Sequence, residues 1–79
     1  MDPEIKVLRI IADFSDGGIH QRELYKRSKL NIKLFLSCVE NLINKNFIKE
    51  IKRSGYTFYF ITDKGRETLK KYKNDKEEL

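Results

Sequence analysis

Two β-prone runs stand next to each other in a chain whose other apolar residues recur at helical spacing. They cover residues 47–53 and 56–61, are rich in Ile, Phe and Tyr, and are joined at Ser54-Gly55. Such runs on either side of a short Gly-containing link predict a β-hairpin. The hairpin restricts the chain to folds in which one small antiparallel unit is combined with helices.

The first helix is predicted to start at Asp2. Asp2 is a good N-cap, Pro3 suits the first helical position, and Glu4 places an acid in the first turn. The stretch Ser-Asp-Gly-Gly at 15–18 is expected to stop this helix, and Ile19 to form a short extended segment. The apolar stripe of the helix consists of Ile5, Leu8, Ile11 and Ala12.

Two further helices are predicted at 21–28 and 32–45. The helix at 21–28 is polar and can bury only a narrow edge. The helix at 32–45 is apolar, and Asn31 is a good N-cap for it. Asn46 is expected to end the apolar helix in a left-handed conformation. Its core stripe is Phe35, Val39 and Leu42. Its opposite face carries the hydrogen-bonding side chains Lys33, Ser37, Asn41 and Asn44.

A last helix is predicted after the hairpin. The segment 62–65, Thr-Asp-Lys-Gly, resembles a helix start, and the charged stretch 73–78 is expected to fray. The complete order is helix, short strand, helix, helix, two-stranded hairpin, helix. This order predicts an α+β, mainly helical, winged helix-turn-helix fold, with residues 1–79 forming one domain.

The small size of the chain argues against catalysis. A chain of 79 residues buries about 60% of its unfolded surface, too little for a deep cleft with a rigid supporting shell. Cys38 and His20 are the sole cysteine and histidine, so no disulfide, metal site or cofactor is expected. No signal or membrane segment and no small-molecule pocket is evident, and a cytoplasmic, nucleoid-associated protein is expected.

The positive charge of the chain is concentrated in its middle. The formal net charge is +5, of which residues 1–19 contribute −2, residues 20–62 contribute +6 and residues 63–79 contribute +1. A concentrated basic segment is the electrostatic signature of a polyanion-binding protein. A solvated surface that only maintains solubility would have the same charge.

Three segments resemble the archaeal winged-helix transcriptional regulators, in particular the ArnR-type group and related dimeric chromatin-associated proteins, with the MarR family more distant. The resemblance covers residues 4–72 and is strongest at the junction Asn-Phe-Ile-Lys-Glu at 46–50 and at Ile-Thr-Asp-Lys-Gly-Arg at 61–66. The segments that carry it are 21–25, 30–50 and 59–67. Asn46 stands where relatives usually have glycine, and the last helix is expected to be shorter than in relatives that dimerise through it.

The resemblance implies a double-stranded DNA ligand, the third helix in the major groove, a wing on the adjacent backbone or minor groove, and a homodimer. A lysine can donate to guanine and an asparagine can pair with adenine, and Arg53 suits a narrow minor groove. The candidate contacts to bases are Lys33, Leu34, Ser37 and Asn41. The candidate contacts to the backbone or from the wing are Gln21, Arg22, Lys29, Lys52, Arg53, Ser54 and Tyr56.

The faces of the second hairpin strand suggest a dimer surface. Tyr59 and Ile61 are expected to point to the core, which leaves Phe58 and Phe60 for a partner, the first helix or solvent. We expect the dimer surface to include Phe58, Phe60, Leu69 and Tyr72. Stacking of single-stranded bases on these aromatic rings is a weaker alternative.

Two single residues have simple structural interpretations. His20 is expected to cap the second helix or to lie beside a phosphate, and Cys38 to be a small buried apolar residue.

The predicted function is that of a non-enzymatic DNA-binding transcription regulator. The alternative is a winged-helix module that binds protein in a transcription or replication assembly.

Overall fold

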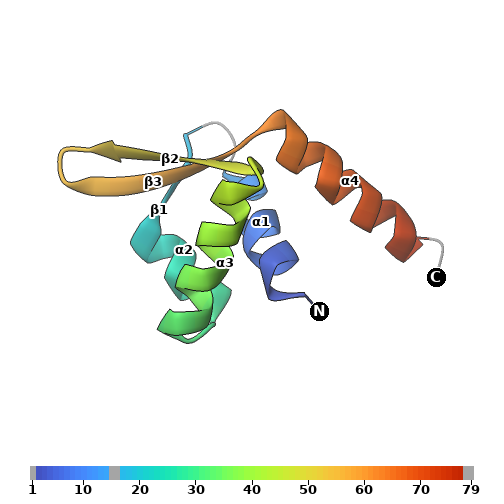
Figure 1. The fold of residues 1–79 in the computed structure, drawn as a ribbon, viewed down its shortest axis with the longest axis horizontal. Helices are drawn as coiled ribbons and strands as arrows, with labels where there is room; N and C mark the ends of the chain where they lie inside the picture. Colours follow the sequence, from blue (N-terminus) through green and yellow to red (C-terminus); the bar gives the residue numbers. More distant parts are fainter. Residues whose placement is uncertain (1, 15–16, 78–79) are drawn as a thin grey trace.

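The computed structural model describes residues 2–14 and 17–77, with side chains for residues 2–14 and 17–72. The elements follow the predicted order (Figure 1). They are α1 (Pro3–Asp13), β1 (Ile19–His20), α2 (Gln21–Ser28), α3 (Ile32–Asn44), β2 (Ile48–Arg53), β3 (Tyr56–Ile61) and α4 (Asp63–Glu77). The described helices include none that is long and apolar enough to cross a membrane.

Local capping sets the ends of α1. The Asp2 side chain accepts a hydrogen bond from the backbone N–H of Glu4 at 2.9 Å, as expected of an N-cap. The helix ends at Asp13, ahead of the predicted stop, and the Gly18 N–H donates to the Phe14 carbonyl at 2.8 Å. Ser15 and Asp16 of the predicted stop lie outside the described residues.

The sheet has three antiparallel strands in the order β1-β3-β2. Ile19 of β1 pairs with Tyr59, and Glu50 of β2 pairs with the same residue from the other side. The predicted hairpin is therefore extended by the short segment at Ile19. Ser54 and Gly55 have φ values of 52° and 82°, the left-handed pair that a tight turn between twisted strands requires.

Helices α1, α2 and α3 pack together on one side of the sheet, and α4 leads away from them (Figure 1). The core lies between these three helices and the sheet, and Tyr59 is its largest fully buried side chain. Core residues are Val7, Leu8, Ile11, Ile19, Leu24, Phe35, Cys38, Val39, Leu42, Ile48 and Tyr59. Cys38 is thus the buried apolar residue that the sequence predicts.

The junction between α3, the sheet and α4 is tightly packed. The Thr62 hydroxyl donates to the Asn46 carbonyl at 2.6 Å and accepts from the Gly65 N–H at 3.1 Å, which caps α4. A Cβ atom on Gly65 would overlap the carbonyl oxygen of Phe47, so only glycine lets the helix approach this closely. Asn46 has a φ of 63°, which confirms the predicted left-handed cap.

Helix α4 is longer than the sequence predicts. It contains 15 residues and continues through 73–77, where fraying was expected. That segment contains neither proline nor glycine, so nothing in it breaks a helix that has already started. The expectation that the helix frays from residue 73 is wrong for this reason, whereas its shortness compared with relatives that dimerise through it stays a prediction.

Candidate nucleic-acid interface

Helix α3 has the buried and exposed faces that the sequence predicts. Its N-cap Asn31 accepts from the Leu34 N–H at 2.9 Å, which starts the helix so that Phe35 and Leu42 point into the core. The opposite face is exposed to solvent and carries Lys33, Ser37, Asn41 and Asn44. Leu34 is exposed as well. The side of α3 that is rich in hydrogen-bonding groups therefore does not pack against the protein core.

Among the side chains that the structure describes, Asn41 is the member of this face with a hydrogen-bond partner in another element. Its Nδ2 donates to the Glu4 carboxylate at 3.1 Å, and the Lys45 Nζ donates to the other Glu4 oxygen at 3.0 Å. This contact raises the pKa of Lys45, because the ammonium form is the one that hydrogen-bonds to Glu4 and is attracted by its charge. The Asn41 amide is thus hydrogen-bonded to α1.

The start of α2 presents one cation and one polar side chain that is already engaged. His20 caps the helix, with its Nδ1 accepting from the Arg22 N–H at 3.0 Å, which confirms its predicted capping role. The Arg22 side chain is exposed, whereas Gln21 donates from Nε2 to the Tyr59 hydroxyl at 3.0 Å. Lys29 ends α2 with a φ of 56° and is exposed in the turn before α3.

The Tyr59 hydroxyl lies where α2 meets the sheet. It accepts from Gln21 and donates to the Glu50 carboxylate at 3.4 Å. Burial and, to a lesser degree, the neighbouring Glu50 charge raise the pKa of Tyr59. Burial also raises the pKa of the Cys38 thiol, and the charge of Glu4 adds to this effect. Both shifts favour the neutral form of the group, which suits a structural role.

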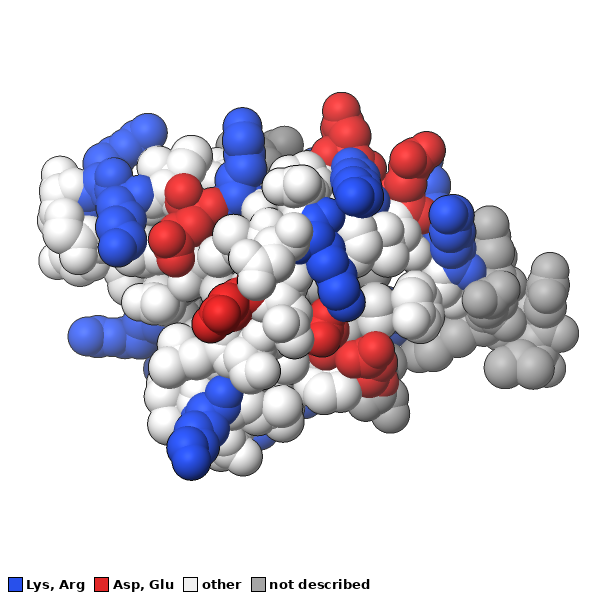
Figure 2. Space-filling model, in the orientation of Figure 1, with Lys and Arg blue, Asp and Glu red and all other residues white. Residues whose placement is uncertain are grey.

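The wing projects away from the helices and carries exposed side chains at its tip. Arg53 and Tyr56 are paired across the last position before the turn, and Lys52 precedes them. Figure 2 shows Lys and Arg side chains at the wing end of the face drawn, with an acidic side chain beside them and further basic and acidic side chains along the molecule. All the residues that the sequence predicts as wing contacts are exposed, namely Lys52, Arg53, Ser54 and Tyr56.

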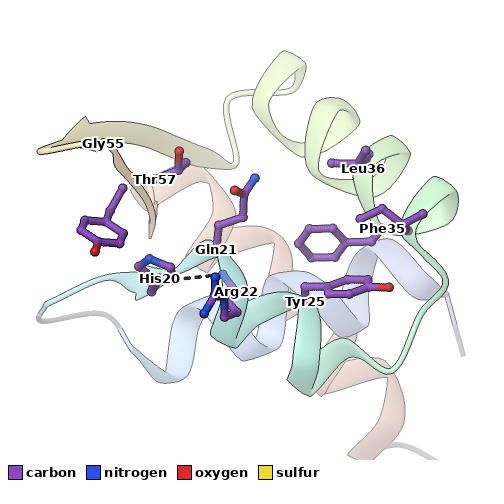
Figure 3. A pocket seen from close by; sticks show the side chains of 10 residues that line it. His20, Gln21, Arg22, Tyr25, Phe35, Leu36, Gly55 and Thr57 are labelled. Atoms are coloured by element: carbon purple, nitrogen blue, oxygen red, sulfur yellow. Dashed lines mark hydrogen bonds between the residues drawn. The ribbon is translucent and has the colours of Figure 1, made fainter.

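A hollow of about 490 Å³ lies between the start of α2, the first turns of α3 and the wing (Figure 3). Arg22 and Tyr56 line it, together with two apolar residues of α3, Ile32 and Leu36, that are not among the predicted site residues. Ile32 is 52% exposed and Leu36 is 50% exposed. Their spacing of four residues places them on one side of the helix, and this spacing was the signal available in the sequence.

The residues predicted for a dimer surface are covered to different degrees. The Phe58 ring lies edge-on to His20 with centroids 5.4 Å apart, and the Phe60 ring lies against Gly18. Leu69 packs against the core, whereas Tyr72 is 42% exposed. Helix α4 therefore offers Tyr72 as the most accessible of the four.

No group of three or more His, Cys, Asp and Glu side chains that could hold a metal ion occurs within the described part of the chain. The polar groups that line the hollow instead come from the start of α2 and from the wing, and they include the cation Arg22 and the hydroxyl groups of Tyr25, Tyr56 and Thr57. Such a set of groups can bind an anion or a polyanion without chemistry of its own.

Comparison with solved structures shows the same fold in other proteins. PcaV, a transcriptional regulator from Streptomyces coelicolor solved with its natural ligand, is 18% identical with a TM-score of 0.76 over 89% of this chain and 50% of that one. BpsR of Bordetella bronchiseptica, whose DNA binding is regulated by 6-hydroxynicotinic acid, is 14% identical with a TM-score of 0.82 over 99% of this chain and 56% of that one. The chain thus spans about half the length of these regulators.

A protein of similar size has the same fold. F-93 of SSV1 is 25% identical with a TM-score of 0.75, over 99% of this chain and 93% of that one. A search of curated proteins finds no match. The winged helix-turn-helix family model matches residues 4–79. Together with the observed order of helices and strands, this match shows that the chain belongs to the winged helix-turn-helix family.

Proposed function

We propose that the protein binds double-stranded DNA as a non-enzymatic transcription regulator, with α3 in the major groove and the wing on the adjacent backbone or minor groove. The observation that carries the proposal is the hollow between them. The first turns of α3 and the wing residue Tyr56 border the same hollow, and Arg22 lines it as well. A duplex bound in this way would cover the hollow, with the base edges of the major groove at its α3 wall and the backbone at its wing side.

The exposed side chains divide into two roles. Lys33 and Ser37 face away from the core on α3 and are suited to base edges, with Leu34 beside them. Arg22 and Lys29, at the two ends of α2, are suited to phosphates, which fix register without reading sequence. Gln21 can join them only if it shares its amide with Tyr59, and Asn41 can reach a base only if it gives up or shares Glu4.

The wing supplies the remaining contacts. Arg53 is exposed at the end of β2, next to the tight turn at Ser54. A guanidinium group is favoured in a narrow, electronegative minor groove. We therefore propose that Arg53 makes the deepest wing contact, with Lys52, Ser54 and Tyr56 beside it on the backbone.

Several finer points belong to the same proposal. They are that residues 1–79 act as one domain, that the protein is of the archaeal ArnR type and nucleoid-associated in the cytoplasm, and that it forms a homodimer through Phe58, Phe60, Leu69 and Tyr72. The accessible ring of Tyr72 on the long helix α4 supports the dimer. Light scattering at high micromolar concentration tests it, and a monomeric mass would contradict it.

Salt dependence tests DNA binding itself. A protein that makes about six to ten phosphate contacts loses about a thousandfold or more in affinity between about 50 and 200 mM salt. We expect a loss of this order for duplex DNA, measured by fluorescence anisotropy. Failure to bind any duplex, or an affinity that does not change with salt, would refute the proposal.

A protein-binding module in a transcription or replication assembly is the second candidate. The observation that favours it is the apolar wall of the hollow, because exposed apolar patches with a polar rim are typical of protein interfaces. This function predicts binding to a protein partner with little salt dependence and no affinity for duplexes.

A further inference from the structure

The first two turns of α3 expose three large apolar side chains, Ile32, Leu34 and Leu36, of which Ile32 and Leu36 line the hollow. Ile32 is the first residue of the helix and Leu36 follows one turn later, and about half of each side chain is open to solvent. Both line the hollow beside the wing, and Figure 3 shows Leu36 on the wall that α3 contributes. The start of a helix placed in the major groove is the part that contacts base edges.

Packing of the core does not require Ile32 and Leu36 to be apolar. The core of α3 is complete with Phe35, Cys38, Val39 and Leu42, all of which are buried. Ile32 and Leu36 lie to one side of that stripe. A contiguous exposed apolar patch on a small protein marks a binding surface. Ile32 and Leu36 are therefore expected to contact a ligand.

The charge around the patch identifies the ligand class. Arg22 lines the same hollow, Lys33 adjoins Ile32 in the helix, and Arg53 lies at the wing tip, all of them exposed. The ligand must therefore combine negative charge with small apolar groups. Duplex DNA has both in the major groove, where thymine alone presents a methyl group among the polar base edges.

Few hydrogen-bonding side chains on α3 are available to contact bases. The Asn41 amide, which could pair with adenine, is held by Glu4 at 3.1 Å. Near the start of the helix Lys33 and Ser37 remain, and each offers a single flexible group, whereas Asn44 is the last residue of α3. Much of the contact between the helix and the bases must then come from the apolar side chains.

We infer that Ile32 and Leu36 read thymine by contacting its 5-methyl group, so that the protein prefers A·T pairs opposite the start of α3. This inference rests on the proposed binding of duplex DNA with α3 in the major groove. It adds two specificity-determining residues to that function and names the base they select.

Replacement of thymine by deoxyuridine tests the inference, because it removes the methyl group and leaves base pairing unchanged. A binding duplex is first selected from a random pool with the whole protein, and its thymines are then replaced one at a time. Burial of one methyl group contributes about 0.8 kcal/mol, or about fourfold in affinity. We expect a loss of about fourfold at one or two thymines and little change at the others.

Two variants assign the effect to these residues. Leu36→Ala should make the thymine and deoxyuridine duplexes bind alike at one position, and Ile32→Ala should do so at a neighbouring position. Leu36→Met keeps apolar contact and should retain the preference. Lys52→Ala is the control, because loss of a wing cation should weaken both duplexes equally. Thermal unfolding checks that each variant is folded.

The possible results distinguish failure of thymine recognition from failure of DNA binding. If no duplex binds, the proposed function fails and the inference fails with it. If duplexes bind with strong salt dependence but deoxyuridine is tolerated at every position, or the selected duplex lacks A·T pairs, the proposed function stands and the reading of thymine is wrong. The same conclusion follows if the alanine variants keep the preference for thymine.

Discussion

The carboxylate of Glu4 accepts a hydrogen bond from the Asn41 side chain at 3.1 Å, although the two residues are 37 positions apart in the sequence. Lys45 donates to the other oxygen of the same carboxylate. One acidic residue in the first turn of α1 therefore holds the second half of α3. The contact links the packing of the two helices to the residue that the sequence predicts to read adenine.

Opposite effects on specificity are expected when the two ends of this contact are removed. Asn41→Ala should relax the preference for one base pair, since a bidentate contact to adenine contributes about 1–3 kcal/mol of discrimination. Glu4→Ala should sharpen it at the same pair, because Asn41 no longer has a competing partner. Competition binding with duplexes that differ at single positions measures both effects.

A purely structural role for Asn41 would give a different pattern. Each variant would then lower the free energy of unfolding by about 1 kcal/mol or less, as for other partly exposed polar contacts. Neither variant would change the order in which duplexes are preferred. Urea denaturation of the two variants, run beside the binding measurements, distinguishes the two roles.

A uniform loss of affinity is expected from the wing variant Lys52→Ala. Lys52 is exposed on β2, where it is suited to a phosphate and cannot read sequence. Its removal should weaken all duplexes alike and lower the slope of log affinity against log salt by about one. A loss confined to certain sequences, or an unchanged slope, would show that Lys52 does not neutralise a phosphate.

Local sequence predicts most of the helix and strand limits of this chain. Asp2 and Asn31 cap their helices, Asn46 adopts its left-handed conformation, and the turn at Ser54-Gly55 closes the hairpin as expected. Each of these features depends on hydrogen bonds or backbone angles within a few residues. The type of residue at one position is then sufficient to predict the structure there.

The contacts between distant segments could not be predicted in the same way. The bond from Glu4 to Asn41 depends on how α1 crosses α3, and the pairing of Ile19 with Tyr59 depends on where the chain returns to the sheet. Apolar spacing also fails to separate a buried leucine from Leu36, which is half exposed. Exposure of an apolar residue is decided by which neighbour covers it, and sequence spacing contains no such information.

The junction before α4 should tolerate no side chain at Gly65. A Cβ atom there would overlap the Phe47 carbonyl oxygen and press on the Ile61 side chain. Gly65→Ala should therefore lower the free energy of unfolding by about 1–3 kcal/mol, although alanine is the better helix former. Gly17→Ala is the control, because nothing lies within 4 Å of the added Cβ. Urea denaturation should place only the Gly65 variant at a lower midpoint, and equal midpoints would contradict the packing described.

Tyr59 should make the stability of the protein depend on alkaline pH. Its ordinary pKa is 10.0, and burial together with Glu50 raises the pKa in the folded state. The folded state therefore binds the phenolic proton more tightly than the unfolded state does. The resulting stability is fully present below about pH 10 and is lost as the pH rises through the folded pKa.

The variant Tyr59→Phe removes this dependence. At neutral pH it should lower the free energy of unfolding by about 1 kcal/mol, since the hydrogen bonds to Gln21 and Glu50 are lost. Above about pH 10 the difference from the wild type should shrink, because only the wild type still loses stability through this tyrosine. Urea denaturation at a series of pH values between about 8 and 11 measures the difference, and a constant difference across that range would show that Tyr59 titrates alike in both states.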